Sequence, residues 1–282
     1  MQTISSSDGT AIREIFGRPK ALIGMIHCPP FPGAPRYDGT PVEAILDACL
    51  RDAAALIGGG MHGLMVENHG DIPFSKPDDI GPETAAFMAV VTDRVRREFD
   101  VPMGVNVLAN APLQALAVAR AAQAQFIRVN QWANAYVANE GFMEGRAAEA
   151  LRYRAALRGD GIRVFADAHV KHGSHAITAD RSVAELTRDL AFFDADAVIA
   201  TGQRTGNTAT MDEIEEVAAA TSLPVLVGSG VTADNVGAIL ARVDAVIVAS
   251  SLKEAGVWWN PVEPARVAAF TAAAAPVLEA AQ

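Results

Sequence analysis

The side chains best suited to chemistry follow an apolar run at residues 162–167. Asp167, His169 and Lys171 alternate with small apolar residues, and a period of two places alternate side chains of an extended chain on one face. We therefore predict that these three side chains point together into one pocket. Such a set suits general acid and base catalysis, with Asp167, His169 or Glu67 moving protons and Lys171 stabilising an enolate or forming a Schiff base.

A divalent metal ion would give the same region a different chemistry. Imidazole and carboxylate groups are ligands for zinc and manganese, and magnesium also accepts carboxylates. The candidate ligands are His27, Glu67, Asp167 and His169. In a third interpretation, the acidic groups only form ion pairs with basic neighbours such as Arg128. The residues alone leave these three possibilities open.

Further polar side chains stand at or near the ends of other apolar runs. We expect the following five to contact a substrate: His27, Asn68, Asn106, Arg128 and Asn130.

Two segments of glycine and serine follow apolar runs late in the chain. The first is Gly228-Ser229-Gly230, followed by Thr232 as a possible helix cap, and the second is Ser250-Ser251. Glycine lets backbone amides approach an anion, while hydroxyl groups and helix N-termini add further attraction. We predict a phosphate site here, although glycine after a strand is also typical of an ordinary turn. Additional contributions are expected from Thr201, Gly202 and Lys253.

The elements that must position these groups form a repeating pattern. Eight short apolar runs each end in a polar residue or glycine, at residues 21–27, 62–67, 102–107, 125–130, 162–167, 196–201, 223–228 and 244–249. Between them lie amphipathic patterns typical of helices, at residues 41–57, 82–99, 112–123, 146–157, 180–193, 211–221 and 233–240. Alternating strands and helices predict an α/β fold with a parallel sheet.

The same pattern can close into a barrel or form an open doubly wound sheet. A dinucleotide-binding open sheet would carry GxGxxG after its first strand, whereas residues 28–33 read CPPFPG. The 282 residues also match one barrel of about 250 residues. We therefore predict a single (β/α)8 TIM barrel over residues 1–282, with residues 1–15 as an N-terminal extension or cap. No nicotinamide or flavin cofactor is expected.

Composition narrows the classes of partner. A formal net charge of −10, without a dense basic run, argues against nucleic acid. The first ten residues lack the basic and apolar pattern of a secretory signal, and no apolar stretch approaches the roughly 20 residues of a membrane span. We therefore expect a cytoplasmic location and no membrane span. Two connections, at residues 28–40 and 131–145, are unusually long, and such loops are usually functional or disordered. Four prolines in the first favour an ordered lid or rim, with a rigid surface connector as the alternative.

Several motifs resemble the BtpA family, also called BtpA/SgcQ, among the ribulose-phosphate-binding barrels. The likeness lies in IGMIHCPPFPGAP at residues 23–35, VEN at 66–68, DAHVKH at 167–172, VGSGVT at 227–232 and VIVASSLK at 246–253. It implies the barrel and a phosphorylated ligand, and it links the family to photosystem I biogenesis and to sugar utilisation. Cys28 stands where the family pattern has an aliphatic residue, so it is not expected to be catalytic.

These observations favour an enzyme that isomerises, epimerises or cleaves a sugar phosphate by proton abstraction beside a carbonyl. A non-catalytic assembly factor of the photosystem I biogenesis type, using the barrel as a binding platform, is the first alternative. A nucleotide- or nucleoside-processing enzyme is the second. The expected partner is a phosphorylated small molecule, and the chain is expected to form a homo-oligomer.

Overall fold

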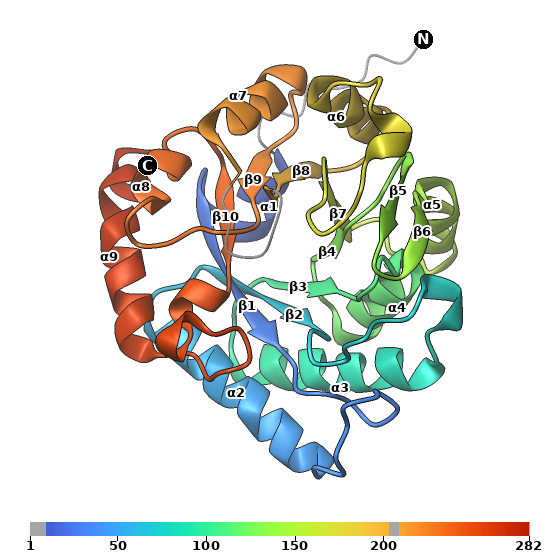
Figure 1. Ribbon diagram of the computed structural model, residues 1–282. Helices are drawn as coiled ribbons and strands as arrows, with labels where there is room; N and C mark the ends of the chain where they lie inside the picture. The colour runs from blue at the N-terminus through green and yellow to red at the C-terminus, as the bar shows by residue number, and fades with distance from the viewer. Residues whose placement is uncertain (1–9, 203–208, 282) are drawn as a thin grey trace.

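The computed structural model describes residues 10–202 and 209–281. In this part of the chain, eight parallel strands close into a barrel in the order β1-β10-β9-β8-β7-β4-β3-β2 (Figure 1). The barrel strands are β1 Ala21–His27, β2 Gly63–Glu67, β3 Met103–Asn106, β4 Phe126–Val129, β7 Arg163–Asp167, β8 Ala197–Ala200, β9 Val225–Val227 and β10 Ala245–Val248. Each lies inside one of the eight apolar runs, and the predicted (β/α)8 fold is confirmed. β1 pairs with β10, with Ala21 opposite Ala245, and this pairing closes the barrel.

Helices surround the barrel and cover its outer face (Figure 1). They are α2 Val42–Gly58, α3 Pro82–Glu98, α4 Pro112–Ala122, α5 Ala147–Ala156, α6 Val183–Phe192, α7 Met211–Ala220, α8 Val236–Leu240 and α9 Pro264–Ala280. Proline in the first turn suits the starts of α3, α4 and α9. Ser182 and Thr210 cap α6 and α7 by accepting a backbone hydrogen bond.

The helix after β9 differs from the prediction. α8 begins at Val236 and has five residues. Thr232 does not cap it, because Asn235 occupies the N-cap position; the Thr232 amide donates to Asn235 Oδ1 at 2.8 Å in the turn before the helix. The predicted phosphate segment at 228–232 therefore ends in a turn, and the argument from a helix N-terminus does not apply to it.

Several connections contain secondary structure of their own. The predicted long loop at residues 131–145 contains an antiparallel hairpin of β5 Ala135–Ala138 and β6 Gly141–Glu144. Short 3-10 helices interrupt other loops, namely η1 Pro77–Asp79, η2 Ala176–Thr178, η3 Ser250–Leu252 and η4 Glu254–Gly256. In Figure 1 the hairpin stands beside the barrel at the side of α5.

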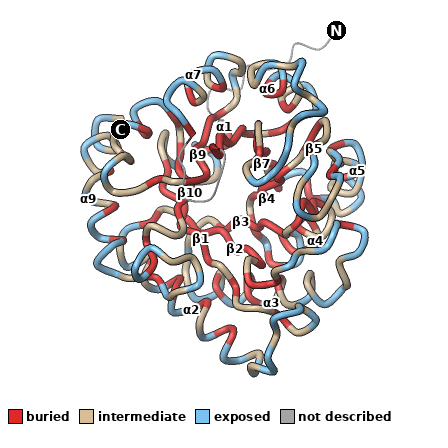
Figure 2. The backbone as a smooth tube through the Cα atoms, in the orientation of Figure 1, coloured by how far each residue is buried: buried red, intermediate tan, exposed pale blue. Residues whose placement is uncertain are grey.

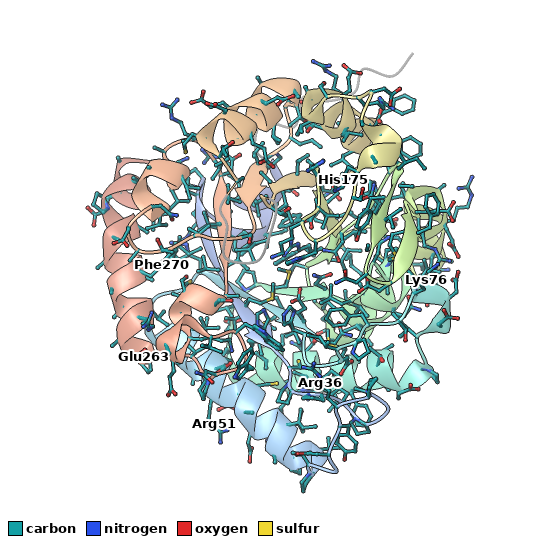
Figure 3. The ribbon with its side chains drawn as sticks, viewed as in Figure 1. Arg36, Arg51, Lys76, His175, Glu263 and Phe270 are labelled. Atoms are coloured by element: carbon teal, nitrogen blue, oxygen red, sulfur yellow. The ribbon has the colours of Figure 1, made fainter. Side chains whose placement is uncertain are left out.

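The core has two parts, and Figure 2 shows the buried residues gathered along the strands and the inner faces of the helices. Between barrel and helices lie apolar side chains such as Phe270, which Figure 3 shows on the inner side of α9. The barrel interior is filled by residues including Met65 and Phe165. Helix α1, Thr10–Phe16, adds Ile12 and Phe16 to this interior cluster.

No helix in the described ranges has the length and apolar character required to span a lipid bilayer.

Candidate functional site

A cavity of about 630 Å³ lies at the carboxyl ends of the barrel strands. This is the end at which barrels of this class build their active sites. Ten predicted site residues line it: His27, Glu67, Arg128, Asn130, Lys171, Gly228, Ser229, Gly230, Ser250 and Ser251. Seven do not: Asn68, Asn106, Asp167, His169, Thr201, Gly202 and Lys253.

Strand register explains why residues distant in sequence meet at the mouth. His27 lies opposite Glu67, Glu67 opposite Asn106, and Asn106 opposite Arg128. Paired residues of parallel strands point to the same face, so these four polar side chains form one layer. Directly below it lie apolar side chains such as Met25 and Met65, which are buried in the barrel interior.

Two imidazoles and a carboxylate form the most compact cluster in the layer. Glu67 Oε1 lies 3.0 Å from His69 Nδ1 and 3.6 Å from His27 Nε2. The two imidazole rings stack with their centroids 4.4 Å apart. The Trp258 ring meets the His69 ring edge-on, with 4.3 Å between the two ring centroids. Burial and the neighbouring His69 lower the pKa of His27 to about 3. Burial alone would raise the pKa of Glu67, but His69 and His27 more than offset this and hold it well below its ordinary value.

Asp167 does not point into the cavity, which corrects the predicted convergence. Its carboxylate accepts two hydrogen bonds from Arg128, at 2.9 and 3.0 Å, and a third from Asn130 at 3.1 Å. Both partners of this ion pair are buried. Burial alone would lower the pKa of Arg128, but Asp167 raises it above its ordinary value. For Asp167, the structure therefore agrees with the interpretation as an internal ion pair.

His169 and Lys171 do not share a face with Asp167, because β7 ends at Asp167 and the chain then turns. The period of two applies only to an extended chain. His169 instead stacks on His175, with centroids 3.7 Å apart, and burial together with His175 lowers the pKa of His169 to about 4. Figure 3 labels His175 at the side of the barrel near this loop.

Lys171 does line the cavity. Its Nζ donates to Ser229 Oγ at 3.3 Å, which connects the loop after β7 to the loop after β9. Burial, and then the neighbouring Arg128, lower the pKa of Lys171 to about 8. A buried lysine with this pKa is partly neutral near physiological pH, as a base or nucleophile requires.

The two predicted phosphate segments lie side by side. Residues 228–232 and 249–251 both line the cavity, and Ser251 Oγ donates to the Val231 carbonyl at 2.7 Å. Gly230 adopts a positive φ of 66°, a conformation that glycine reaches without strain. The Gly228 amide is used by the sheet, where it donates to the Ala200 carbonyl.

Two residues predicted to assist phosphate binding have other partners, and a third does not line the cavity. Lys253 is buried, and its Nζ donates to Asp52 Oδ2 of α2 at 2.7 Å. Thr201 is also buried, and its hydroxyl donates to the His169 carbonyl at 3.0 Å. Gly202 follows Thr201 outside the cavity lining, and the connection that continues from it, residues 203–208, lies outside the described residues.

Two of the predicted substrate contacts support neighbouring groups instead. Asn68 donates to Asp71 and to the Leu108 carbonyl, each at 3.1 Å. Asn106 donates to Glu67 Oε2 at 2.6 Å and so orients that carboxylate.

Cys28, which was not expected to be catalytic, is buried. Burial raises the pKa of its thiol well above the usual range.

The candidate metal ligands also change. Asp167 and His169 do not join His27 and Glu67, whereas His69 does, and the ligand atoms of this trio all lie within 4.8 Å of one another. His69 was not among the predicted candidate ligands, although its position two residues after Glu67, just beyond the end of an apolar run, was a usable signal.

Comparison with known proteins places the chain in a family. The BtpA family model matches residues 18–276. The chain belongs to the BtpA family. Within that family, an uncharacterized protein of Archaeoglobus fulgidus is 39% identical over 84% of this chain and 93% of its own length. The photosystem I biogenesis protein BtpA of Synechocystis is 36% identical over 93% of this chain and 90% of its own length.

A solved structure supports the fold assigned to this BtpA-family chain. This structure is (S)-3-O-geranylgeranylglyceryl phosphate synthase of Thermoplasma acidophilum in complex with its substrate sn-glycerol-1-phosphate. It superimposes on this chain with a TM-score of 0.58. The alignment covers 99% of this chain and 100% of that one at 14% sequence identity. At this identity the likeness shows the barrel fold alone.

Proposed function

We propose that this chain is an enzyme that acts on a sugar phosphate. It would isomerise, epimerise or cleave this substrate after removing a proton beside a carbonyl group. One observation carries the proposal. The Lys171 amine lies in the cavity wall with its pKa lowered to about 8, 3.3 Å from the Ser229 hydroxyl of the predicted phosphate loop. The assigned base and the predicted phosphate loop therefore border the same cavity.

The phosphate end of the substrate is assigned to residues 228–232 and 249–251. They follow the seventh and eighth strands of the barrel, β9 and β10, where barrels of this type repeatedly bind phosphate. The hydroxyls of Ser229 and Ser250 are suitable donors, and both residues line the cavity. The Thermoplasma barrel holds a phosphate ester, sn-glycerol-1-phosphate, and this supports a phosphate ester as the class of ligand.

Lys171 is assigned the proton transfer. In its neutral form the amine takes the proton from the carbon beside the carbonyl, and the electron pair of that C–H bond moves into an enolate. The resulting ammonium stays beside the enolate and can return the proton to the same carbon. In an isomerisation it returns the proton to the adjacent, former carbonyl carbon, after the proton of the neighbouring hydroxyl has moved to the former carbonyl oxygen. With a pKa near 8, roughly a tenth of the amine is neutral at pH 7. Asp167 is less suited to this role, because Arg128 and Asn130 occupy its carboxylate.

The experiment is solvent deuterium exchange. Full-length protein is incubated in D2O with ketose phosphates, aldose phosphates, nucleoside monophosphates and the matching unphosphorylated sugars, and exchange is followed by NMR. We expect exchange into a sugar phosphate only. Lys171→Met should reduce its rate by about a hundredfold or more, while Lys76→Met, at an exposed loop lysine labelled in Figure 3, should leave it unchanged.

A binding platform without catalysis is the competing function, and the name of the Synechocystis relative, a photosystem I biogenesis protein, favours it. Phosphate-ester binding without exchange for any compound in the panel would overturn the enzyme proposal and favour the platform. Exchange into a nucleotide would instead favour the nucleotide-processing alternative. The homo-oligomeric state stays a prediction, which light scattering of the purified chain tests.

A further inference from the structure

An imidazole and carboxylate cluster lies at the ends of β1 and β2, and the proton transfer assigned to Lys171 does not use it. His27 and Glu67 are the last residues of two paired strands and lie opposite each other. His69 follows two residues later and returns to the same carboxylate. Two rigid strands thus fix two of the three groups, as precise ligand positioning requires.

The distances fit a metal ion. Donor atoms bound tetrahedrally to zinc at about 2.0–2.1 Å lie ~3.3 Å from one another. In the cluster, Glu67 Oε1 lies 3.0 Å from His69 Nδ1 and 3.6 Å from His27 Nε2. All three ligand atoms lie within 4.8 Å of one another, so one ion can be reached by all of them.

Neighbouring groups already orient two of the ligands. His27 Nδ1 lies 3.2 Å from the Trp258 carbonyl. A carbonyl only accepts hydrogen bonds, so Nδ1 carries the proton and Nε2 presents its lone pair towards Glu67. Asn106 donates to Glu67 Oε2 at 2.6 Å and leaves Oε1 for the two histidines. Histidine ligands of metals are commonly fixed in this way by a carbonyl or carboxylate partner.

A hydrogen bond between Glu67 and His69 is the alternative use of this contact. Glu67 Oε1 lies 3.0 Å from His69 Nδ1, an atom that is shielded from solvent. A bound ion would replace that hydrogen bond, because two ligand atoms of one metal also lie at about this separation.

We propose that His27 Nε2, Glu67 Oε1 and His69 Nδ1 bind a divalent transition-metal ion, with zinc as the first candidate. Two imidazoles with one carboxylate suit zinc or manganese better than magnesium or calcium, which prefer oxygen ligands. All three residues line the cavity. Three protein ligands with the remaining positions facing a cavity are characteristic of catalytic rather than structural sites.

The ion would face the same cavity as Lys171 and would polarise a substrate oxygen there. This catalytic use rests on the proposed function, whereas metal binding can be measured without any substrate. The ligand set differs from the sequence prediction by replacing Asp167 and His169 with His69.

The test uses the full chain, stripped with a chelator and titrated with Zn²⁺ and with Co²⁺. Isothermal calorimetry should give one equivalent of Zn²⁺, and Co²⁺ should produce visible absorption bands with the intensity typical of nitrogen and oxygen ligands. His69→Gln should weaken Zn²⁺ binding by a factor of about ten to a hundred or more. The matched control is His172→Gln, a histidine that also lines the cavity but lies outside the trio, and it should bind Zn²⁺ like the unchanged chain.

Absence of stoichiometric Zn²⁺ and Co²⁺ binding would overturn the proposal, as would equal losses in His69→Gln and His172→Gln. His27→Gln and Glu67→Gln test the buried ligands, and circular dichroism separates lost binding from lost folding. Binding of metal without deuterium exchange would support this site and count against the proposed function. Undiminished exchange after complete metal removal would overturn the catalytic use of the ion and leave Lys171 as the assigned base.

Discussion

Replacing Asp167 by asparagine separates a structural carboxylate from a catalytic one. The Asp167 and Arg128 side chains are 0% and 4% exposed, and two hydrogen bonds of 2.9 and 3.0 Å join them. Asparagine has nearly the same shape but no charge, so Asp167→Asn leaves a buried guanidinium without its ionic partner. Breaking a buried pair in this way typically costs about 3–5 kcal/mol.

The assay is urea unfolding of the purified chain, followed by far-ultraviolet circular dichroism. We expect the free energy of unfolding to fall by that amount and the melting temperature to fall by roughly 6–20 °C, taking about 2–4 °C per kcal/mol for a domain near this size. Asp93→Asn removes solvent-accessible ion pairs with Arg96 and Arg97 on α3. It is the control and should cost at most about 1 kcal/mol.

The double variant Arg128→Met with Asp167→Leu should recover most of the loss, because apolar replacement of both members removes the uncompensated charge. An Asp167→Asn protein within about 1 kcal/mol of the unchanged chain would refute this reasoning. The carboxylate would then be unnecessary for folding, and a direct role in the chemistry would be the better explanation.

Three further changes test other parts of the structure. Turnover should rise with pH through about 8 as Lys171 loses its proton, and Lys171→Arg should remove this rise from the pH–rate profile. Because the pKa of Lys171 in the folded protein lies below the ordinary 10.5, the free energy of unfolding should also increase between about pH 8 and 10.5. Urea unfolding at several pH values measures this increase. Lys253→Met should lower stability by about 3 kcal/mol by stranding its buried carboxylate partner, with phosphate-ester affinity in calorimetry changed less than about twofold. Gly104→Ala should cost about 1–3 kcal/mol in urea unfolding, because the added Cβ would lie 2.1 Å from the buried Phe126 ring, whereas Gly161→Ala, with no atom within 4 Å, should cost under about 0.5 kcal/mol.

The strands were predictable because strands that are buried on both faces consist of short, continuous runs of apolar residues. Residues 245–248 read AVIV and are buried on both faces, as helices outside a parallel barrel require. The hairpin at residues 135–144 was not predicted. It packs only partly against the barrel, so its burial pattern is mixed and its sequence resembles a long loop.

The site was predictable at the level of which loops meet, but less so for individual side chains. Lys171 and Lys253 each follow a barrel strand by a few residues, yet one lines the cavity and the other is buried against Asp52. Asp52 lies 201 residues from Lys253 in sequence, so local pattern carries no sign of that pairing. Likewise, the end of β7 at Asp167 decides which way His169 points, and strand ends are the least certain feature of a sequence pattern.

The pairing of Ala21 with Ala245 also has a consequence for biosynthesis. The two residues are separated by almost the whole barrel, and their backbone groups meet only after β10 has been made. At a synthesis rate of about 5–20 residues per second, β1 waits roughly 10–45 s on the ribosome for this partner. During that time one edge of an apolar strand is open to other chains. Completion of the barrel is therefore a late event, and nascent chains stalled before residue 245 are the ones most exposed to aggregation.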